Sequence, residues 1–293
     1  MKSKEKIVIV LKWLMIVVCF FGALALLNES LNLQQYKPST PSEKIINIFG
    51  ILLAALFVLG VHELGHLTMG LYHGFRFELF VVGPLGIKRE NDSIKVYFNT
   101  DFALFGGIAS TSPSAQQVDV PKKFAQVLLA GPIISMLFAL VCFVLVPIIG
   151  NPFASIAFTA GAISLGIFIV TTFPERTGVF YTDRKRYQRL ITPGKEQDVE
   201  LAILRIMGNF SKDNSYKDVN LEDIETLLSA ELPFFKLYGY FNKICFELEN
   251  FGNVEEATLQ AYQFNSKGLP KNMLSAWSKE IKSFEDKFAR QVN

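Results

Sequence analysis

The sequence has few of the residues that usually build disulfides or metal sites. It contains 3 cysteines and 3 histidines among 293 residues. The cysteines are odd in number, lie far apart and match no metal-binding spacing, so we interpret them as buried free thiols; they are Cys19, Cys142 and Cys245. The formal net charge is only +2, so the composition predicts no nucleic-acid partner.

Apolar residues, in contrast, are abundant. Half of the chain is hydrophobic and its mean hydropathy is +0.30, which is too apolar for an ordinary soluble protein. Four apolar stretches reach the length of about 20 residues that a helix needs to cross a bilayer. They are residues 7–27, 45–72, 124–149 and 153–173. We therefore predict a mainly α-helical, multi-pass membrane protein in contact with the lipid bilayer.

The first apolar stretch has two interpretations. It follows a basic amino terminus and is interrupted only by Lys12. Residues 23–25, Ala-Leu-Ala, loosely resemble the cleavage site of a signal peptide. Because the stretch is long for a signal peptide, we expect a retained membrane anchor.

The distribution of positive charge predicts the orientation in the membrane. Lysine and arginine concentrate at the amino terminus and in residues 74–123 and 174–195, whereas residues 28–44 carry only Lys37 and Lys44. Four spans place the three basic segments on one side, which the positive-inside rule identifies as the cytoplasm. We therefore predict a protein of the cell membrane with both termini in the cytoplasm.

Two segments outside the spans have patterns of their own. Residues 75–98 contain β-prone runs separated by turn residues, which predict a small β-hairpin or sheet, while residues 99–121 are expected to be irregular. From residue 191 to residue 293 the chain is polar, with apolar residues at helical spacing. We expect a membrane domain over residues 1–190 and a cytosolic all-α domain over residues 191–293, which offers a surface to a protein partner.

The motif His62-Glu63-Leu64-Gly65-His66 lies in the last third of the second stretch. Histidines four apart on a helix share one face and can bind one zinc ion, and Glu63 beside that ion is placed to take a proton from water. The competing interpretation is a pair of core histidines that bond each other or the backbone. It is disfavoured because two of only three histidines fall in this pattern, and because ionisable groups at membrane depth usually indicate function.

A catalytic zinc site also needs a third protein ligand. His73 would lie about 10 Å along a continuing helix from His66, which is too far unless the helix bends at Gly70 or Gly74. Spacing does not choose among the nearby acids, which are Glu78, Asp92, Asp101, Asp119, Glu175 and Asp183. For Asp183 the competing interpretation is a helix N-cap.

Residues 45–190 resemble the site-2 protease family of intramembrane zinc metalloproteases. The resemblance rests on the motif at residues 62–66 in a membrane helix, a β-hairpin after it, Ala-Gly-Pro-Ile-Ile-Ser at residues 130–135, and a late segment from Pro174 to Asp183. It implies Asp183 as the third zinc ligand, Zn²⁺ as the cofactor, and a membrane protein or membrane-bound peptide as the substrate.

The sequence departs from the family pattern at three positions. Arg184 follows the aspartate where glycine is usual, Thr172 replaces an asparagine two residues before Pro174, and Ser135 replaces the asparagine of Gly-Pro-x-x-Asn. The resemblance implies that Ser135 and Thr172 help to position the substrate. Because a hydroxyl has fewer donors and a shorter reach than an amide, we expect an effect on substrate handling rather than on metal binding.

The predicted function is that of an intramembrane zinc endopeptidase, which hydrolyses a peptide bond in or near a transmembrane segment or signal-peptide remnant. Glu63 is the expected general base, and residues 106–107 are expected to border a polar opening to the cytoplasm. The predicted hairpin either offers a strand edge to the substrate or is a structural plug. The alternative function is a catalytically inactive membrane scaffold of the same fold that acts through its cytosolic helices. A transporter is disfavoured because the spans show no inverted-repeat signature.

Overall fold

The fold is described from a computed structural model of the chain. It describes residues 3–90, 93–114, 117, 119–177, 180–267, 269 and 271–292. The chain divides into two compact units. The first comprises Met1–His62 with Ile133–Ile169, and the second comprises Glu63–Pro132 with Val170–Asn293. Each unit is described by itself below.

Within the described residues, four helices are long and apolar enough to cross a membrane, in agreement with the four predicted spans. They are α1 (Ser3–Ser30), α2 (Pro41–Tyr72), α3 (Val120–Leu145) and α4 (Phe153–Thr172). Helices α2 and α3 begin about one turn earlier than the apolar pattern predicts, because their first turns are polar.

The early start of α2 has a local cause. The Glu43 carboxylate accepts hydrogen bonds from the backbone N–H groups of Ser39 and Thr40 at 2.7 and 3.2 Å. In return, the Glu43 N–H donates to the Thr40 hydroxyl at 3.2 Å. This reciprocal arrangement is a capping box, which satisfies N–H groups that the first helical turn leaves open.

In the first unit, small and apolar side chains bring the helices together. Val58 of α2, Cys142 of α3 and Ala160 of α4 form a buried cluster. Other apolar side chains on these helices are more than half exposed, among them Leu52 and Phe57. Such exposure is the pattern expected of helix faces that contact lipid. A short 3₁₀ helix, η1 (Leu33–Tyr36), lies between α1 and α2.

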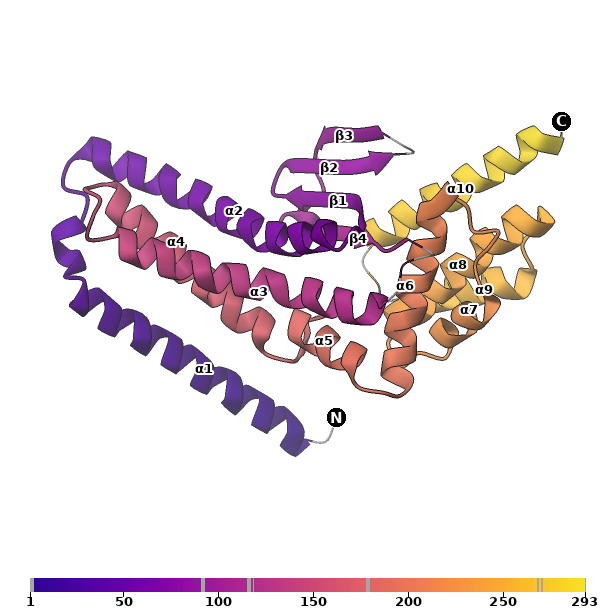
Figure 1. Cartoon of the computed structure of the whole chain (residues 1–293), viewed down its shortest axis with the longest axis horizontal. Helices are drawn as coiled ribbons and strands as arrows, with labels where there is room; N and C mark the ends of the chain where they lie inside the picture. The colour runs from indigo at the N-terminus through magenta and orange to yellow at the C-terminus, as the bar shows by residue number, and fades with distance from the viewer. Residues whose placement is uncertain are drawn as a thin grey trace. The chain divides into compact units, whose positions relative to one another are not determined.

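The second unit contains an antiparallel sheet in the order β3-β2-β1-β4 (Figure 1). Its strands are β1 (Arg76–Val82), β2 (Leu85–Glu90), β3 (Ser93–Phe98) and β4 (Ile108–Ser112), with a short 3₁₀ helix η2 (Phe102–Leu104) before β4. The predicted small sheet is therefore confirmed. The expectation that residues 99–121 are irregular is wrong for β4, whose short, polar sequence is stabilised by backbone pairing with β1. Asn91 and Asp92, expected in a turn, lie outside the described residues.

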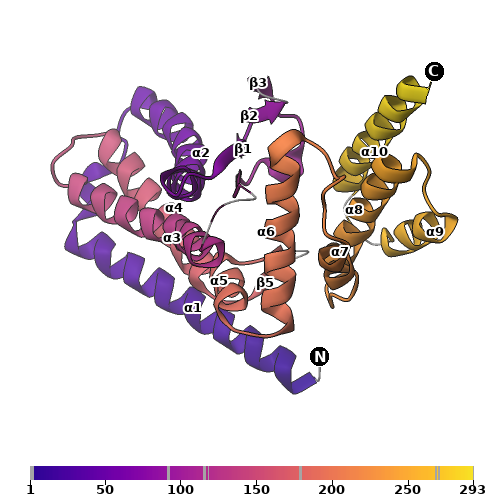
Figure 2. The same ribbon diagram turned by 45° about the vertical axis from the view of Figure 1, so that its right-hand side comes forward.

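The second unit also contains a helical region, which follows a two-stranded ribbon of β5 (Arg176–Thr177) and β6 (Phe180–Tyr181). Its helices are α5 (Asp183–Ile191), α6 (Lys195–Asp213), α7 (Leu221–Leu228), α8 (Pro233–Phe251), α9 (Glu256–Asn265) and α10 (Lys271–Val292). Helix α8 packs against α7, α9 and α10, and α6 packs against α5 and α7 (Figure 2). Leu227, Phe241 and Cys245 lie in their shared core. The helical character predicted for residues 191–293 thus agrees with the structure, while a domain boundary at residue 190 stays a prediction.

Candidate metal centre

Helix α2 runs without a break through the His-Glu-Leu-Gly-His motif. His62 and His66 therefore lie one helical turn apart on one face, as the spacing predicts. Each offers a ring nitrogen, and Asp183 offers a carboxylate oxygen, with all three ligand atoms within 4.8 Å of one another. Among the described residues, this is the group of histidine, cysteine and acidic side chains that is close enough to share one metal ion.

Asp183 reaches this group from the first position of helix α5. Its Oδ2 atom lies 3.5 Å from the Nε2 atom of His66. Two ligand atoms bound about 2.0 Å from one tetrahedral zinc ion lie about 3.3 Å apart, so this separation suits a shared metal. Two imidazoles and one carboxylate are also a donor set typical of catalytic zinc sites. The residues present therefore fit a zinc ion.

The residue at the N-cap position of α5 is Thr182, not Asp183. The Thr182 hydroxyl donates to the Phe173 carbonyl at 2.7 Å and accepts from the Glu175 N–H at 3.1 Å. These bonds tie the start of α5 to the segment that follows α4. The interpretation of Asp183 as an N-cap is therefore wrong.

Both histidines use their second ring nitrogen in a hydrogen bond. The Nδ1 atom of His66 lies 2.7 Å from the Val127 carbonyl, and that of His62 lies 2.9 Å from the Ser135 hydroxyl. A carbonyl can only accept, so Nδ1 of His66 carries the proton and Nε2 keeps its lone pair for a metal. Hydrogen bonds of this kind fix the orientation and tautomer of metal-binding histidines. Sequence reasoning missed both contacts, because each depends on helix α3.

Ser135 is fully buried, and its own carbonyl accepts a hydrogen bond from the Ser164 hydroxyl at 2.7 Å. Ser135 thus contacts the candidate ligand His62 through the ring nitrogen Nδ1. Thr172, the other predicted substrate-positioning residue, ends helix α4; in the described part of the chain its buried hydroxyl has no hydrogen-bond partner. The role of both residues in substrate binding stays a prediction.

Two glycines allow α2 and α3 to approach closely at His66. A Cβ atom at Gly65 would lie 2.8 Å from the Ala130 carbonyl oxygen, and one at Gly131 would overlap the His66 ring. Close helix approach in membranes commonly depends on small residues. The Gly131 of the Ala-Gly-Pro segment therefore has a direct physical role, since the imidazole of His66 lies against it.

Glu63 points toward the segment that leads into β4. A Cβ atom at Gly107 would lie 2.9 Å from the Oε1 atom of Glu63, and Gly107 has a φ of +98°, which favours glycine. The predicted polar opening to the cytoplasm beside residues 106–107 stays a prediction. Gly107 leaves the Glu63 carboxylate room beside the candidate ligands.

Among the described residues, no other candidate ligand belongs to this group. His73 lies 2.8 Å from the Gln126 side chain, and Glu78 bonds to Ser112 and pairs with Arg76. Asp101 bonds to Asn99 through its backbone, and Asp92 lies outside the described residues. The exclusion of His73 as a ligand, made from its distance along the helix, agrees with this arrangement.

Comparison with known families decides the relationship. The sequence model of peptidase family M50 matches residues 50–287, most of the chain. The chain belongs to peptidase family M50. Family M50 is the site-2 protease family, whose members are zinc-dependent metalloproteases of membranes. The match extends into α10, well beyond the range of residues 45–190 that carried the resemblance, so that range was too short. No curated protein and no solved structure matches the M50 chain.

Proposed function

We propose that this M50 protein is an intramembrane zinc endopeptidase, which cuts a membrane protein in or near a transmembrane segment or signal-peptide remnant. The observation that carries the proposal is the convergence of His62, His66 and Asp183 beside Glu63. The membership of family M50 and the four candidate spans support the same conclusion.

In this proposal His62, His66 and Asp183 hold the zinc ion. When bound, the ion supplies a Lewis acid and lowers the pKa of a water molecule to about 7. Glu63 takes a proton from the attacking water and later gives it to the leaving amine of the cut peptide. Ser135 and the Val127 carbonyl keep the two imidazoles in the orientation that this chemistry needs.

The substrate must present an extended backbone, because a helix hides its peptide groups in its own hydrogen bonds. β3 is an edge strand of the sheet, and its Val96 and Phe98 side chains are 69 and 75 % exposed. An unwound substrate segment added at this edge gains backbone hydrogen bonds and apolar contacts. The competing role of the sheet is a structural plug, in which this edge is covered by other chain or lipid.

The test is the substitution Glu63→Gln in the full-length chain. It removes the general base but keeps the shape of the side chain, so we expect wild-type zinc content and a loss of cleavage. The measurement compares fragments of membrane proteins from cells that carry either form, together with the zinc content of the purified proteins. Uncut substrate that accumulates only with Glu63→Gln supports the proposal.

Unchanged processing in the Glu63→Gln cells would contradict the protease proposal. It would favour the inactive scaffold, which the departures from the family pattern at Ser135, Thr172 and Arg184 suggest. In that case the helices after residue 190 carry the function through a protein partner.

A further inference from the structure

We propose that Glu200 is a positioning residue for Asp183, and that the helical region thereby controls metal binding. The inference rests on the metal site of the proposed function. Its basis is a cluster of charges between α5 and α6, in which Glu200 and one arginine are buried and the second arginine is 30 % exposed. Three side chains form the cluster: Arg186 and Arg189 of α5, and Glu200 of α6.

The Glu200 carboxylate divides its two oxygens between the two arginines. Its Oε1 atom accepts from Nε of Arg189 at 2.9 Å, and its Oε2 atom accepts from Nη2 of Arg186 at 3.1 Å. The side chains of Glu200 and Arg189 are only 2 and 5 % exposed. Charges buried to this degree are stable only while paired and hydrogen-bonded, so the cluster has one strongly favoured arrangement.

Arg189 also contacts the chain on the other side of Asp183. Its guanidinium lies 4.5 Å from the centre of the Tyr181 ring, two residues before Asp183, and 5.5 Å from that of Phe235 in α8. Its Nη1 atom pairs with Glu196 at 3.0 Å. Arg189, six residues after Asp183, therefore contacts the chain two residues before it and holds the two sides of this ligand together.

The charge cluster also contacts the apolar residues that pack around the hydrogen-bond partner of His66. Arg186 lies over the Phe124 ring at 5.5 Å. Phe124 belongs to a buried apolar cluster with Val127, whose carbonyl binds His66, and with Leu190 of α5 and Leu204 of α6. One packed group thus holds both a ligand from α2 and the ligand from α5.

Helix α5 needs this support because it has only nine residues. Helices this short are not stable by themselves, so contacts with neighbouring elements set their position. Ligand distances in metal sites are held to within about 0.2 Å, which makes a small shift of α5 costly for binding. A change in α6 that moves Glu200 is therefore transmitted to Asp183.

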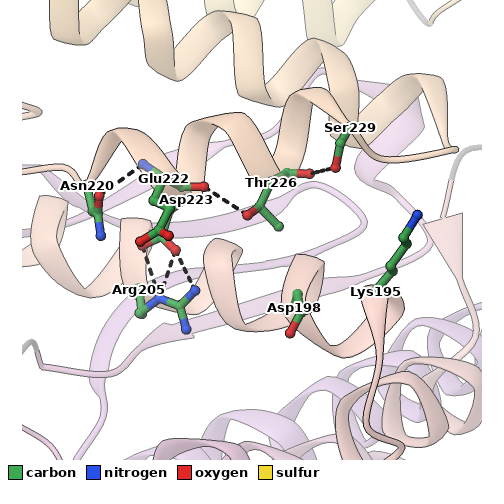
Figure 3. Close-up of a pocket in the computed structure, with 8 residues that line it drawn as sticks. All are labelled: Lys195, Asp198, Arg205, Asn220, Glu222, Asp223, Thr226 and Ser229. Atoms are coloured by element: carbon green, nitrogen blue, oxygen red, sulfur yellow. Dashed lines mark hydrogen bonds and ion pairs between the residues drawn. The ribbon is translucent and has the colours of Figure 1, made fainter.

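Helix α6 offers a matched control on its other side. There Arg205 pairs with Asp223 of α7, with its Nε atom 2.9 and 3.0 Å from the two carboxylate oxygens. The Asp223 side chain is 4 % exposed, comparable to Glu200. Both residues line a polar cavity of about 470 Å³ between α6 and α7. In Figure 3 the Arg205 and Asp223 side chains point toward each other. Asp223→Asn removes a buried paired carboxylate, as Glu200→Gln does, but from the α6–α7 contact.

The experiment compares full-length wild type, Glu200→Gln and Asp223→Asn in detergent. Zinc affinity is measured by competition with a chelator, the ligand geometry by the visible spectrum of the Co²⁺-loaded protein, and stability by thermal unfolding. We expect Glu200→Gln to weaken zinc binding by about 10- to 100-fold, as supporting residues of metal ligands do, and to alter the cobalt spectrum. Asp223→Asn is expected to lose thermal stability but to keep the wild-type affinity and spectrum.

Arg186→Lys serves as a second variant, because it keeps the charge but loses the planar donor group and so disturbs the fold less. A weaker zinc affinity in this variant supports the proposal even if Glu200→Gln does not fold. Wild-type affinity and spectrum in Arg186→Lys and in folded Glu200→Gln would overturn it. Lack of metal in wild type would overturn the metal site itself, whereas metal-loaded wild type with unchanged variants overturns only the role of Glu200.

Discussion

The two helices that supply the candidate ligands are built on different principles. α2 has 32 residues, is apolar throughout its middle, and carries His62 and His66 at a spacing set by helical geometry. α5 has nine residues, carries Asp183 at its first position, and depends on ion pairs with α6. Helix α2 thus sets the spacing of its two ligands by its own geometry and needs α3 only to orient their rings, whereas α5 depends on its neighbours for the position of its ligand.

The largest expected effect comes from removing a ligand from each helix. His62→Ala and Asp183→Ala should both lower zinc affinity by more than the roughly 100-fold that a supporting hydrogen bond contributes. The measurement is the zinc content of purified protein after dialysis against a weak chelator. Asp183→Ala that binds zinc as well as wild type would contradict the assignment of α5 as a ligand helix.

A smaller effect is expected from Gly131→Ala on helix α3. The added methyl group overlaps the His66 ring, and overpacking of this kind costs about 1–3 kcal/mol. We expect reduced zinc affinity together with a lower temperature of unfolding. Gly22→Ala in α1 is the control, because its Cβ would meet nothing within 4 Å. Equal zinc affinity in the two variants would show that His66 does not depend on this close approach.

The smallest effect is expected from Ser135→Ala, which removes the hydrogen bond to Nδ1 of His62. Zinc affinity should fall by about 10-fold, at the low end for a supporting group, because α2 still holds the ring at its helical position. Ser164→Ala is the matched control, since that buried hydroxyl donates to the Ser135 carbonyl and not to the histidine.

The same pair of variants separates two roles for Ser135. A loss of zinc affinity in Ser135→Ala alone indicates that the hydroxyl supports the metal site. Unchanged zinc affinity with a raised KM would instead favour the substrate-positioning role that the family resemblance implies. The zinc affinity of Ser135→Ala thus shows whether the His62 ring needs a contact from α3 in addition to its helical position on α2.

The difference between the helices also explains what could be predicted from the sequence. The spans, the sheet after α2 and the pairing of His62 with His66 follow from local patterns of hydropathy and spacing, and these agree with the structure. Strand β4 could not be predicted, because its short polar sequence becomes a strand only by pairing with β1.

Asp183 shows the limit of local patterns most clearly. Spacing left six acids as candidates, and only the family resemblance singled out Asp183. Its position depends on the hydrogen bond of Thr182 to the segment after α4, and on the pairing of the α5 arginines with Glu200 of α6. The partners in these contacts lie outside α5. No periodicity within α5 encodes them, so physical reasoning from the sequence alone could not find this ligand.

The charge cluster around Glu200 limits where the chain can be truncated without disturbing the candidate metal centre. A truncation after residue 190 would keep every candidate ligand and all four candidate spans, yet would delete the carboxylate that pairs with both arginines of α5. Two unpaired guanidinium groups would then repel each other beside the ligand. Fragments intended for crystallisation or reconstitution should therefore retain α6, because the support of the candidate metal centre extends beyond the last candidate span.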